Sequence, residues 1–351
     1  MQFRRQWHLL LQNQLDICYR MTKYIEGLIK SWADDEMNHI NLKINHLEGR
    51  LFKTYEPNKF VNGEFWDRCD AWLSSATSDE HKKTLYRLLT QIFYVGPIEF
   101  EELFRCAYDG PIARWLIDRE QIDICAENAQ QRLIEAVEKT WFCPITDSFR
   151  INSFFHINNL PANANLRPDW CSLRSLGDIY KVKNYCKNQN VKRLVLLEDF
   201  VGGGSQSLAA VKFAATHIEG LEVLFVPMII CPDGAVKARL LEDEVNLRRN
   251  YSLRFDPVLE LNKPAFFTET DSSLPERDTE ALRDLIKSSY DLVSGGVKRG
   301  EPYHMYGFPP KRPTGGLVVM YTNTPNNTLP LIHWRPKSES WQPVFPRHSR
   351  V

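Results

Sequence analysis

The sequence feature that most constrains the fold is the segment at residues 193–209, which reads RLVLLEDFVGGGSQSLA. Its apolar run Leu194–Leu197 is typical of a central parallel strand, and the run LAAVKFAATHI that starts at Leu208 indicates a helix. Between them lie two acids, Glu198 and Asp199, and a loop of glycines. A buried strand followed by a short loop and a helix is the building unit of parallel sheets. The segment therefore predicts an α/β domain.

The loop of this segment has the composition of a phosphate-binding site. Glycines let backbone N–H groups approach an anion, and the N-terminus of the following helix adds a favourable dipole. Hydroxyl and amide side chains after the glycines can donate to phosphate oxygens, while the acids before them can accept hydrogen bonds from sugar hydroxyls. Together these parts predict a site for ribose 5-phosphate, with Glu198 and Asp199 on the sugar and the loop residues Gly202, Gly203, Gly204, Ser205, Gln206 and Ser207 on the phosphate.

Other nucleotide-binding motifs fit this segment less well. The chain has no GxxxxGK[ST], so it carries no P-loop. A dinucleotide-binding fingerprint could begin at Gly202, but Ser207 stands where its third glycine belongs and the acids precede the loop. A plain glycine-rich turn with a capping serine is the structural alternative, and the acidic pair favours a ligand site. A phosphate cradle predicts that Gly204→Ala weakens ligand binding more than it lowers stability.

The remaining pattern predicts two domains. Residues 1–140 carry helical periodicity, with Ser78 as the N-cap of one helix, and form an expected α-helical domain for partner recognition. Within it, two short helices flank an expected turn at Asp109-Gly110, as a helical hairpin or a helix-turn-helix. Residues 141–351 form the expected α/β domain. Its further apolar runs are WFCPI (141–145), LEVLFVPMII (221–230), AFF (265–267) and GLVVMYT (316–322).

Composition excludes several classes of protein. Forty-four Lys and Arg balance forty-four Asp and Glu, which excludes a chain-wide polybasic nucleic-acid binder. The eight cysteines form no CxxC pair, so we expect buried free thiols in a reducing compartment and no zinc site. Near the N-terminus, the apolar run of three leucines is too short for a signal peptide or a membrane span, and a cytoplasmic protein without membrane contact is predicted. The basic tail after Glu339 predicts an interaction arm.

The central segment resembles a known signature. LVLLEDFVGGGSQS is similar to the phosphoribosyl-pyrophosphate motif of type I phosphoribosyltransferases. It departs from that motif at two positions: Gly203 stands where ordinary members carry threonine, and Gln206 stands where they carry threonine or serine. This variant resembles a divergent phosphoribosyltransferase-like family of prokaryotic conflict systems, found in anti-phage loci that include some retrons. The stretch YTNTPNNTLPLIHW (321–334) resembles the C-terminal signature of that family, so the resemblance covers about residues 141–334.

The resemblance implies a type I phosphoribosyltransferase-like parallel sheet domain behind an N-terminal mainly α-helical or winged-helix-like region. It implies catalytic roles for Glu198 and Asp199, and Mg²⁺ bound with the substrate's pyrophosphate. It also implies a pyrophosphate or base region at Asp147, Ser148, Asn323, Asn326, Asn327 and Thr328. From chemistry alone, Asp147 or Ser148 could instead cap the next helix, and the asparagines could stabilise a turn.

Two functions follow from these expectations. The first is transfer or cleavage at the anomeric carbon of a phosphorylated ribose, with phosphoribosyl pyrophosphate, a nucleotide or an NAD-like molecule as substrate, in an anti-phage effector. The expected partners are then a reverse transcriptase with its RNA/DNA hybrid, or another defence protein. The alternative is a catalytically inactive nucleotide-binding sensor or regulator that uses the same fold.

Overall fold

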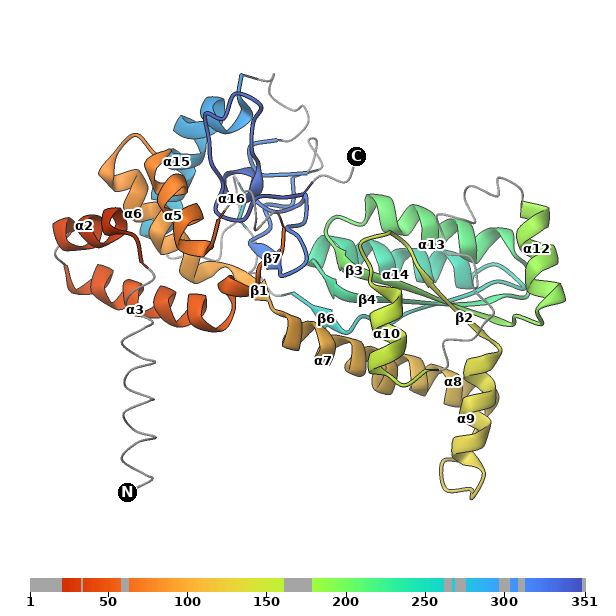
Figure 1. The fold of residues 1–351 in the computed structure, drawn as a ribbon. Helices are drawn as coiled ribbons and strands as arrows, with labels where there is room; N and C mark the ends of the chain where they lie inside the picture. Colours follow the sequence, from red (N-terminus) through yellow and green to blue (C-terminus); the bar gives the residue numbers. More distant parts are fainter. Residues whose placement is uncertain are drawn as a thin grey trace, which may run out of the picture. The chain divides into compact units, whose positions relative to one another are not determined.

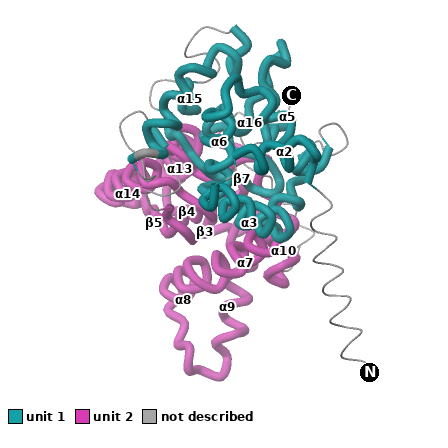
Figure 2. Tube along the Cα trace, turned by 90° about the vertical axis from the view of Figure 1, so that its left-hand side faces the viewer, with its two compact units in different colours: residues 1–97, 263–351 teal, residues 98–262 magenta. Residues whose placement is uncertain are grey.

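The computed structural model describes residues 21–32, 34–57, 63–160, 179–261, 267–268, 276–296, 304–308 and 313–348. The chain divides into two compact units (Figure 2). Unit 1 combines Met1–Pro97 with Lys263–Val351, and unit 2 is Ile98–Asn262.

Unit 2 is built on a parallel sheet. Its strands β2 (Thr140–Pro144), β3 (Arg193–Val201), β4 (Glu222–Ile230) and β5 (Ser252–Phe255) lie side by side in that order, and the short β6 (Leu259–Glu260) also pairs with β4. All residues of β2 and β3 are buried, as near-continuous apolar strands of a covered parallel sheet should be. The predicted α/β architecture is confirmed for this part of the chain.

One face of this sheet is covered by the helices that connect its strands. They are α12 (Ile179–Asn188), α13 (Ser205–His217) and α14 (Pro232–Asn246), and α13 and α14 lie side by side along the sheet (Figure 1). Each connection leads to the neighbouring strand, so the chain advances across the sheet in one direction. Alternate strand residues face these helices, and the core between them includes Trp141, Cys143, Leu194, Leu196, Val223, Phe225, Val211, Ala214, Ala235 and Ala238.

A continuous helical run belongs to the same unit. The helix α7 (Pro97–Ala107) passes through a π-helical segment, Tyr108–Ile112, directly into α8 (Ala113–Glu120). The turn expected at Asp109-Gly110 is therefore wrong, and so is a helix-turn-helix there. The wider π-helical turn accommodates Pro111, which has no N–H to donate, without breaking the helix.

Aromatic and ionic contacts join this run to the sheet. Phe154 on α10 (Ile151–Ile157) lies with its ring centroid 5.5 Å from that of Phe104 on α7 and 6.0 Å from that of Phe142 on β2. At the end of α8, Glu120 accepts a hydrogen bond from the buried Arg193 of β3 at 2.7 Å. These contacts explain why α7 and α8 belong with the sheet, and α9 (Ala129–Glu138) lies in the same unit.

Unit 1 packs helices from both ends of the chain around one core. Asp34 caps the start of its α3 by accepting from the Met37 N–H at 2.7 Å, and Ser78 caps α6 through the His81 N–H at 3.2 Å, which confirms the predicted N-cap. The helices are α2 (Lys23–Trp32), α3 (Asp35–Arg50), α5 (Phe65–Ser74), α6 (Asp79–Leu88), α15 (Glu276–Ser294) and α16 (Pro330–His333).

The apolar run at 316–322 joins unit 1 instead of the large sheet. It supplies β7 (Val318–Met320), which pairs in parallel with β1 (Phe93–Val95). This pairing ties the C-terminal part of the chain to the N-terminal helices, so the compact units do not follow the boundary expected near residue 140. Of the expected AFF strand, only Phe267 lies within the described residues, where its N–H donates to the Gly315 carbonyl at 2.6 Å.

The C-terminal tail is part of the unit 1 core. Trp341 and Phe345 are fully buried, and the Trp341 indole N–H donates to the Leu331 carbonyl at 2.9 Å. The Phe345 ring lies 5.2 Å from the ring centroids of both Phe52 and Tyr55. The expectation of a free interaction arm is wrong for the described part of the tail, because its aromatic residues gain more by burial than its basic residues gain from solvent.

The described residues bear on two further expectations. No helix among them has both the length and the apolar character needed to cross a membrane. Their cysteines are free thiols, and Cys106 and Cys125 are exposed, which corrects the expectation that all would be buried. Cys18 and Cys171 lie outside the described residues.

Replacing Phe345 with alanine should test whether the tail holds unit 1 together. We expect Phe345→Ala to lower the free energy of unfolding by about 3–5 kcal/mol, because a fully buried ring in an aromatic cluster is removed. Leu42→Ala, at a side chain that is 67% exposed on α3, should change it by less than about 0.5 kcal/mol. Urea unfolding measures both. Equal, small effects would mean that the tail is not a core element.

Candidate functional site

The two predicted acids lie within β3, before its last residues. The strand continues to Val201 because Phe200 and Val201 extend the parallel pairing with Ile229 and Ile230 of β4. Glu198 and Asp199 are only 4% and 3% exposed. Burying a carboxylate costs free energy unless hydrogen bonds or charges compensate, so the groups around the pair decide what it can do.

Hydroxyl and amide groups from the segment after β2 bind the Glu198 carboxylate. The register that pairs Pro144 with Leu197 carries this segment alongside the acids. The Thr146 N–H donates to Glu198 Oε2 at 3.1 Å, and the Thr146 hydroxyl lies 3.1 Å from both carboxylate oxygens. Thr146 was not among the predicted site residues. The signal available in the sequence was its place just after the first strand of the predicted sheet.

Ser148 is brought to the other acid. Its hydroxyl donates to Asp199 Oδ1 at 3.1 Å and lies 2.6 Å from the Thr146 hydroxyl, so the two acids and two hydroxyls form one network. The capping alternative is wrong for Ser148 and Asp147, because α10 begins after Arg150 and has no side-chain cap. Asp147 is exposed at the edge of the network, and its charge acts on Glu198.

The network has a definite electrostatic character. Burial raises the pKa of Glu198 well above its ordinary value, and the neighbouring negative charge of Asp199 raises it further. The hydrogen bonds from Thr146 act in the opposite direction and stabilise the ionised form. A carboxyl group with a raised pKa beside a second carboxyl group is the arrangement in which one member can hold a proton while the other carries charge.

The glycine loop follows the acids and opens α13. Gly204 is the N-cap residue, with a left-handed φ of +78° and no side-chain cap for the helix. The N-terminal N–H groups of α13 are therefore free of a capping side chain, as an anion-binding helix start requires. Ser205 and Gln206 are exposed, whereas Ser207 is buried. The acids and the loop thus lie near the carboxyl end of β3, and their role as one binding site stays a prediction.

Gly204 also has a packing reason to be glycine. A Cβ at this position would lie 2.7 Å from Leu208 Cδ1, and the positive φ disfavours any other residue. Gly204→Ala should therefore lower stability as well, and the expectation that it weakens ligand binding more than it lowers stability stays a prediction. Exposed residues of the loop are better probes of ligand binding, because their side chains do not hold the fold.

A second helix start packs against this loop. The helix α14 begins with Pro232 after β4, and a Cβ on its Gly234 would collide with the backbone carbonyl oxygen of Gly202. One turn further along, the Lys237 Nζ donates to the Gly203 carbonyl at 2.8 Å. Sequence reasoning missed both residues. The available signal was the Pro-Asp-Gly start of a helix after the strand next to β3.

The second group of predicted site residues lies in unit 1, where each forms a hydrogen bond with another segment of the same unit. The Asn323 amide donates to the His348 carbonyl and the Asn327 amide donates to the Phe308 carbonyl, both at 3.0 Å. The carbonyl of Asn326 accepts from the Phe308 N–H at 3.2 Å, and the buried Thr328 hydroxyl donates to the Val318 carbonyl at 2.6 Å. These bonds hold the segment against other parts of unit 1 and are not the local bonds of an Asx turn. A role for these residues in ligand binding stays a prediction.

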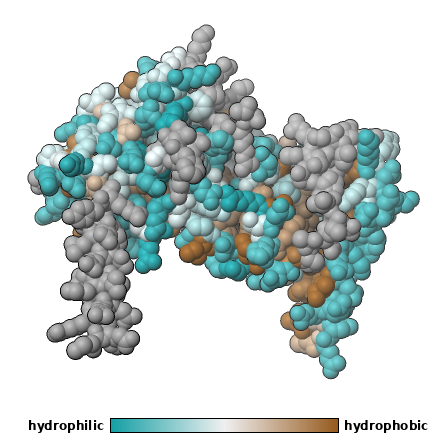
Figure 3. All heavy atoms as spheres, in the orientation of Figure 1, coloured by the Kyte–Doolittle hydropathy of each residue, from teal (hydrophilic) through white to brown (hydrophobic). Residues whose placement is uncertain are grey.

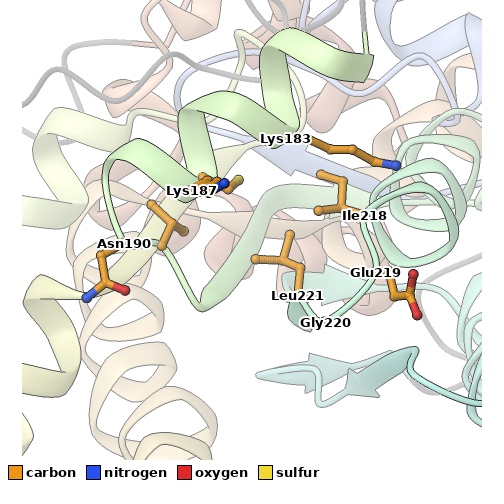
Figure 4. Close-up of a pocket in the computed structure, with 9 residues that line it drawn as sticks. Lys183, Lys187, Asn190, Ile218, Glu219, Gly220 and Leu221 are labelled. Carbon is orange, nitrogen blue, oxygen red and sulfur yellow. The ribbon is translucent and has the colours of Figure 1, made fainter.

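An open groove of about 480 Å³ lies at the opposite edge of the sheet (Figure 4). Its lining includes Val191 and Leu221, which lie just before the starts of β3 and β4, together with Lys183 and Lys187. The groove is therefore at the amino-terminal ends of the strands, whereas the acids and the glycine loop are at the carboxyl ends, where open α/β sheets bind ligands. It is not the site of the acidic pair.

The described residues offer a metal ion little direct ligation. They contain no group of three or more His, Cys, Asp or Glu placed to hold one. A Mg²⁺ ion bound mainly through the phosphates of a substrate needs few protein carboxylates, and the exposed Asp147 beside the acidic pair fits such a role. Mg²⁺ therefore stays a prediction tied to the substrate.

The parallel sheet of unit 2 is consistent with a phosphoribosyltransferase-like domain. A family model, PRTase-CE, matches residues 69–347, and the chain belongs to this family. The match reaches beyond the expected 141–334 and covers residues of both units, from α5 to the C-terminal tail. No curated protein and no solved structure matched the chain.

The raised pKa of Glu198 predicts how stability depends on pH. As pH rises, the unfolded chain ionises Glu198 first, so the folded state holds more protons and its stability falls until the folded Glu198 ionises too. Glu198→Gln removes this penalty. We expect the variant to be more stable than wild type at pH 8, with the difference vanishing near pH 4, whereas Glu127→Gln at an exposed site should match wild type throughout. Urea unfolding across this range decides; a variant less stable at pH 8 contradicts the prediction.

Proposed function

We propose that the chain binds a phosphorylated ribose at the carboxyl end of β3 and acts at its anomeric carbon. One observation carries this proposal: in a PRTase-CE family member, two adjacent buried carboxylates near the end of a strand are followed, two residues later, by a glycine loop that opens a helix without a side-chain cap. The loop and the start of α13 would hold the 5-phosphate, and the acids would bind the ribose hydroxyls. A type I phosphoribosyltransferase fold for unit 2 is part of the proposal.

The hydrogen-bond partners of the two acids support this assignment. Both carboxylates accept hydrogen bonds from hydroxyl groups, those of Thr146 and Ser148, which are the same kind of donor that a ribose offers. A sugar that enters the site would therefore find acceptors already oriented for hydroxyls. The energetic cost of keeping two acids buried together is hard to explain by folding alone and is typical of functional sites.

The proposed reaction is substitution at C1 of the ribose. A lone pair of the acceptor, or of water, forms a bond to C1 while the bond from C1 to the leaving group breaks and its electron pair stays with that group. The proton released by the acceptor passes to the leaving group or to solvent. Positive charge that develops on the sugar would be stabilised by Asp199, and Glu198 could hold or release a proton beside it. Mg²⁺ bound with pyrophosphate would neutralise charge on that leaving group.

The substrate class is phosphoribosyl pyrophosphate, a nucleotide or an NAD-like molecule. The resemblance extends the proposal to anti-phage defence, with a reverse transcriptase and its RNA/DNA hybrid or another defence protein as partner. The helices of unit 2 give limited support for a protein contact, because Ile98, Ile124 and Ile134 of the α7–α9 region are exposed and Figure 3 shows apolar atoms on this part of the surface. Phage plating on cells that carry wild type or Asp199→Asn tests the defence role.

The alternative is a sensor that binds the ligand without turnover. The departures Gly203 and Gln206 from the ordinary signature favour it, since they change the loop that holds the phosphate. Incubation with phosphoribosyl pyrophosphate, NAD and nucleotides in the presence of Mg²⁺, followed by ³¹P NMR and chromatography, separates the two functions. Release of base or pyrophosphate means an enzyme, and tight binding of intact ligand means a sensor.

The acids should be essential for turnover and dispensable for folding. We expect Asp199→Asn and Glu198→Gln each to reduce turnover by about a hundredfold or more, because each removes charge or proton transfer beside C1. Both variants should unfold cooperatively like wild type, and Glu127→Gln should keep full activity. Wild-type rates in both single variants and in the double variant would contradict a catalytic role for Glu198 and Asp199.

The exposed loop side chains should act on ligand affinity alone. We expect Ser205→Ala combined with Gln206→Ala to weaken binding of ribose 5-phosphate about tenfold, or about 1.4 kcal/mol, because two donors at the start of α13 are lost. Gln206→Thr keeps a donor and should retain binding, and Gln189→Ala, exposed at the other edge of the sheet, is the matched control. Calorimetry gives the affinities. Unchanged affinity in the double variant would show that the loop does not bind phosphate.

A further inference from the structure

The first two turns of α14 lie against two consecutive carbonyl groups of the glycine loop. Gly234 has no side chain, and this lets the helix backbone approach the Gly202 carbonyl oxygen, which a Cβ at 234 would strike. Lys237, three residues later and so on the same helix face, donates from Nζ to the Gly203 carbonyl at 2.8 Å. A helix and a cation thus hold successive peptide groups of the loop from one side.

The direction of these carbonyls fixes the direction of the loop N–H groups. In a planar trans peptide, the C=O group and the N–H group of the next residue point in opposite directions. Because the carbonyls of Gly202 and Gly203 are turned toward α14, the N–H groups of Gly203 and Gly204 are turned away from it. Successive N–H groups on one side of a turn form an anion-binding concavity, and the left-handed φ of Gly204 is typical of it.

Lys237 contributes charge as well as geometry. An ammonium group has three donors, and the described bond of Lys237 goes to a neutral carbonyl, which leaves its positive charge uncompensated by that bond. The side chain is half-buried, so solvent screens the charge less than it screens a fully exposed lysine. Lys212 on α13 offers a contrast, since it is exposed and its Nζ lies 3.0 Å from the Glu244 carboxylate.

We propose that Lys237 is a positioning residue of the phosphate site: it holds the Gly203–Gly204 peptide group so that the loop N–H groups face the anion, and it adds positive charge behind the loop. The inference rests on the proposed phosphate site. It assigns to α14 a part in a site whose recognisable motif lies entirely on β3 and α13. The ligand chemistry is a phosphate monoester dianion, for which a cation close to the loop is most favourable.

The test compares Lys237→Met, Lys237→Gln and Lys237→Arg with Lys212→Met in the full chain. Calorimetry and NMR titration measure affinity for ribose 5-phosphate, phosphoribosyl pyrophosphate and inorganic phosphate, and thermal unfolding without ligand monitors the fold. We expect Lys237→Met and Lys237→Gln to lose tenfold or more in affinity for every probe that wild type binds. Lys237→Arg, which keeps a charged donor, should stay within about threefold, and Lys212→Met should match wild type. If Lys237→Met unfolds, Lys237→Gln provides the same comparison.

Each outcome separates this inference from the proposed function. Tight binding of ribose 5-phosphate by wild type and equally by Lys237→Met and Lys237→Gln overturns the role of Lys237 and leaves the proposed function intact. Binding of inorganic phosphate but of neither sugar phosphate overturns the proposed function, while loss of that phosphate binding in Lys237→Met still supports the inference. Binding of no probe by wild type overturns both. Loss of affinity in Lys237→Arg as large as in Lys237→Met would remove the role of charge.

Discussion

The parallel pairing of β2 with β3 is the interaction on which the site depends. It carries Thr146 and Ser148 alongside the two buried acids, to which they donate hydrogen bonds. A buried carboxylate left without hydrogen bonds costs several kcal/mol. Loss of the pairing between β2 and β3 would therefore also remove hydrogen bonds that offset the cost of burying the acids. The hydroxyl network lowers that cost but does not remove it, since the pKa of Glu198 stays raised. The packing of β3, which is buried along its whole length, offsets the remaining cost of burying Glu198.

The glycine loop is held in a comparable way from the other side. The helix α13 begins at Gly204, whose left-handed backbone lets the chain turn from β3 into the helix, and α14 packs closely because Gly234 has no side chain. Two helix starts and one strand end therefore converge on a few residues of backbone. Such convergence turns a flexible run of glycines into a loop with a fixed direction of its N–H groups, which a phosphate site requires. A loop made of flexible glycines is thus rigid here because the elements around it fix its backbone.

The division of the chain into units shows how nonlocal burial overrides local pattern. The helices α7 to α9 have the same periodicity as the helices before them, but Phe104 and Glu120 contact residues of the sheet unit. The tail after Glu339 is rich in basic residues, but Trp341 and Phe345 fill the core of the other unit. Local composition predicts which residues are exposed, but it does not predict which elements pack together. A few large buried side chains decide which elements pack together, because each contributes more to stability than several solvated charges.

The sequence by itself determined the strand, the acids, the glycine loop and the helix between residues 193 and 217, because these parts are adjacent in the chain and need only local geometry. It also indicated the parallel sheet, since apolar runs that alternate with helices have few other ways to bury themselves. Only the tertiary structure decided that Thr146 binds Glu198 and that α14 holds the loop, since residues 52 and 34 positions apart meet only once the strand order is set. The tertiary structure also decided that β7 pairs with β1 and not with the strands of the large sheet. An apolar run specifies burial, and the choice of neighbouring strand depends on packing across the whole unit.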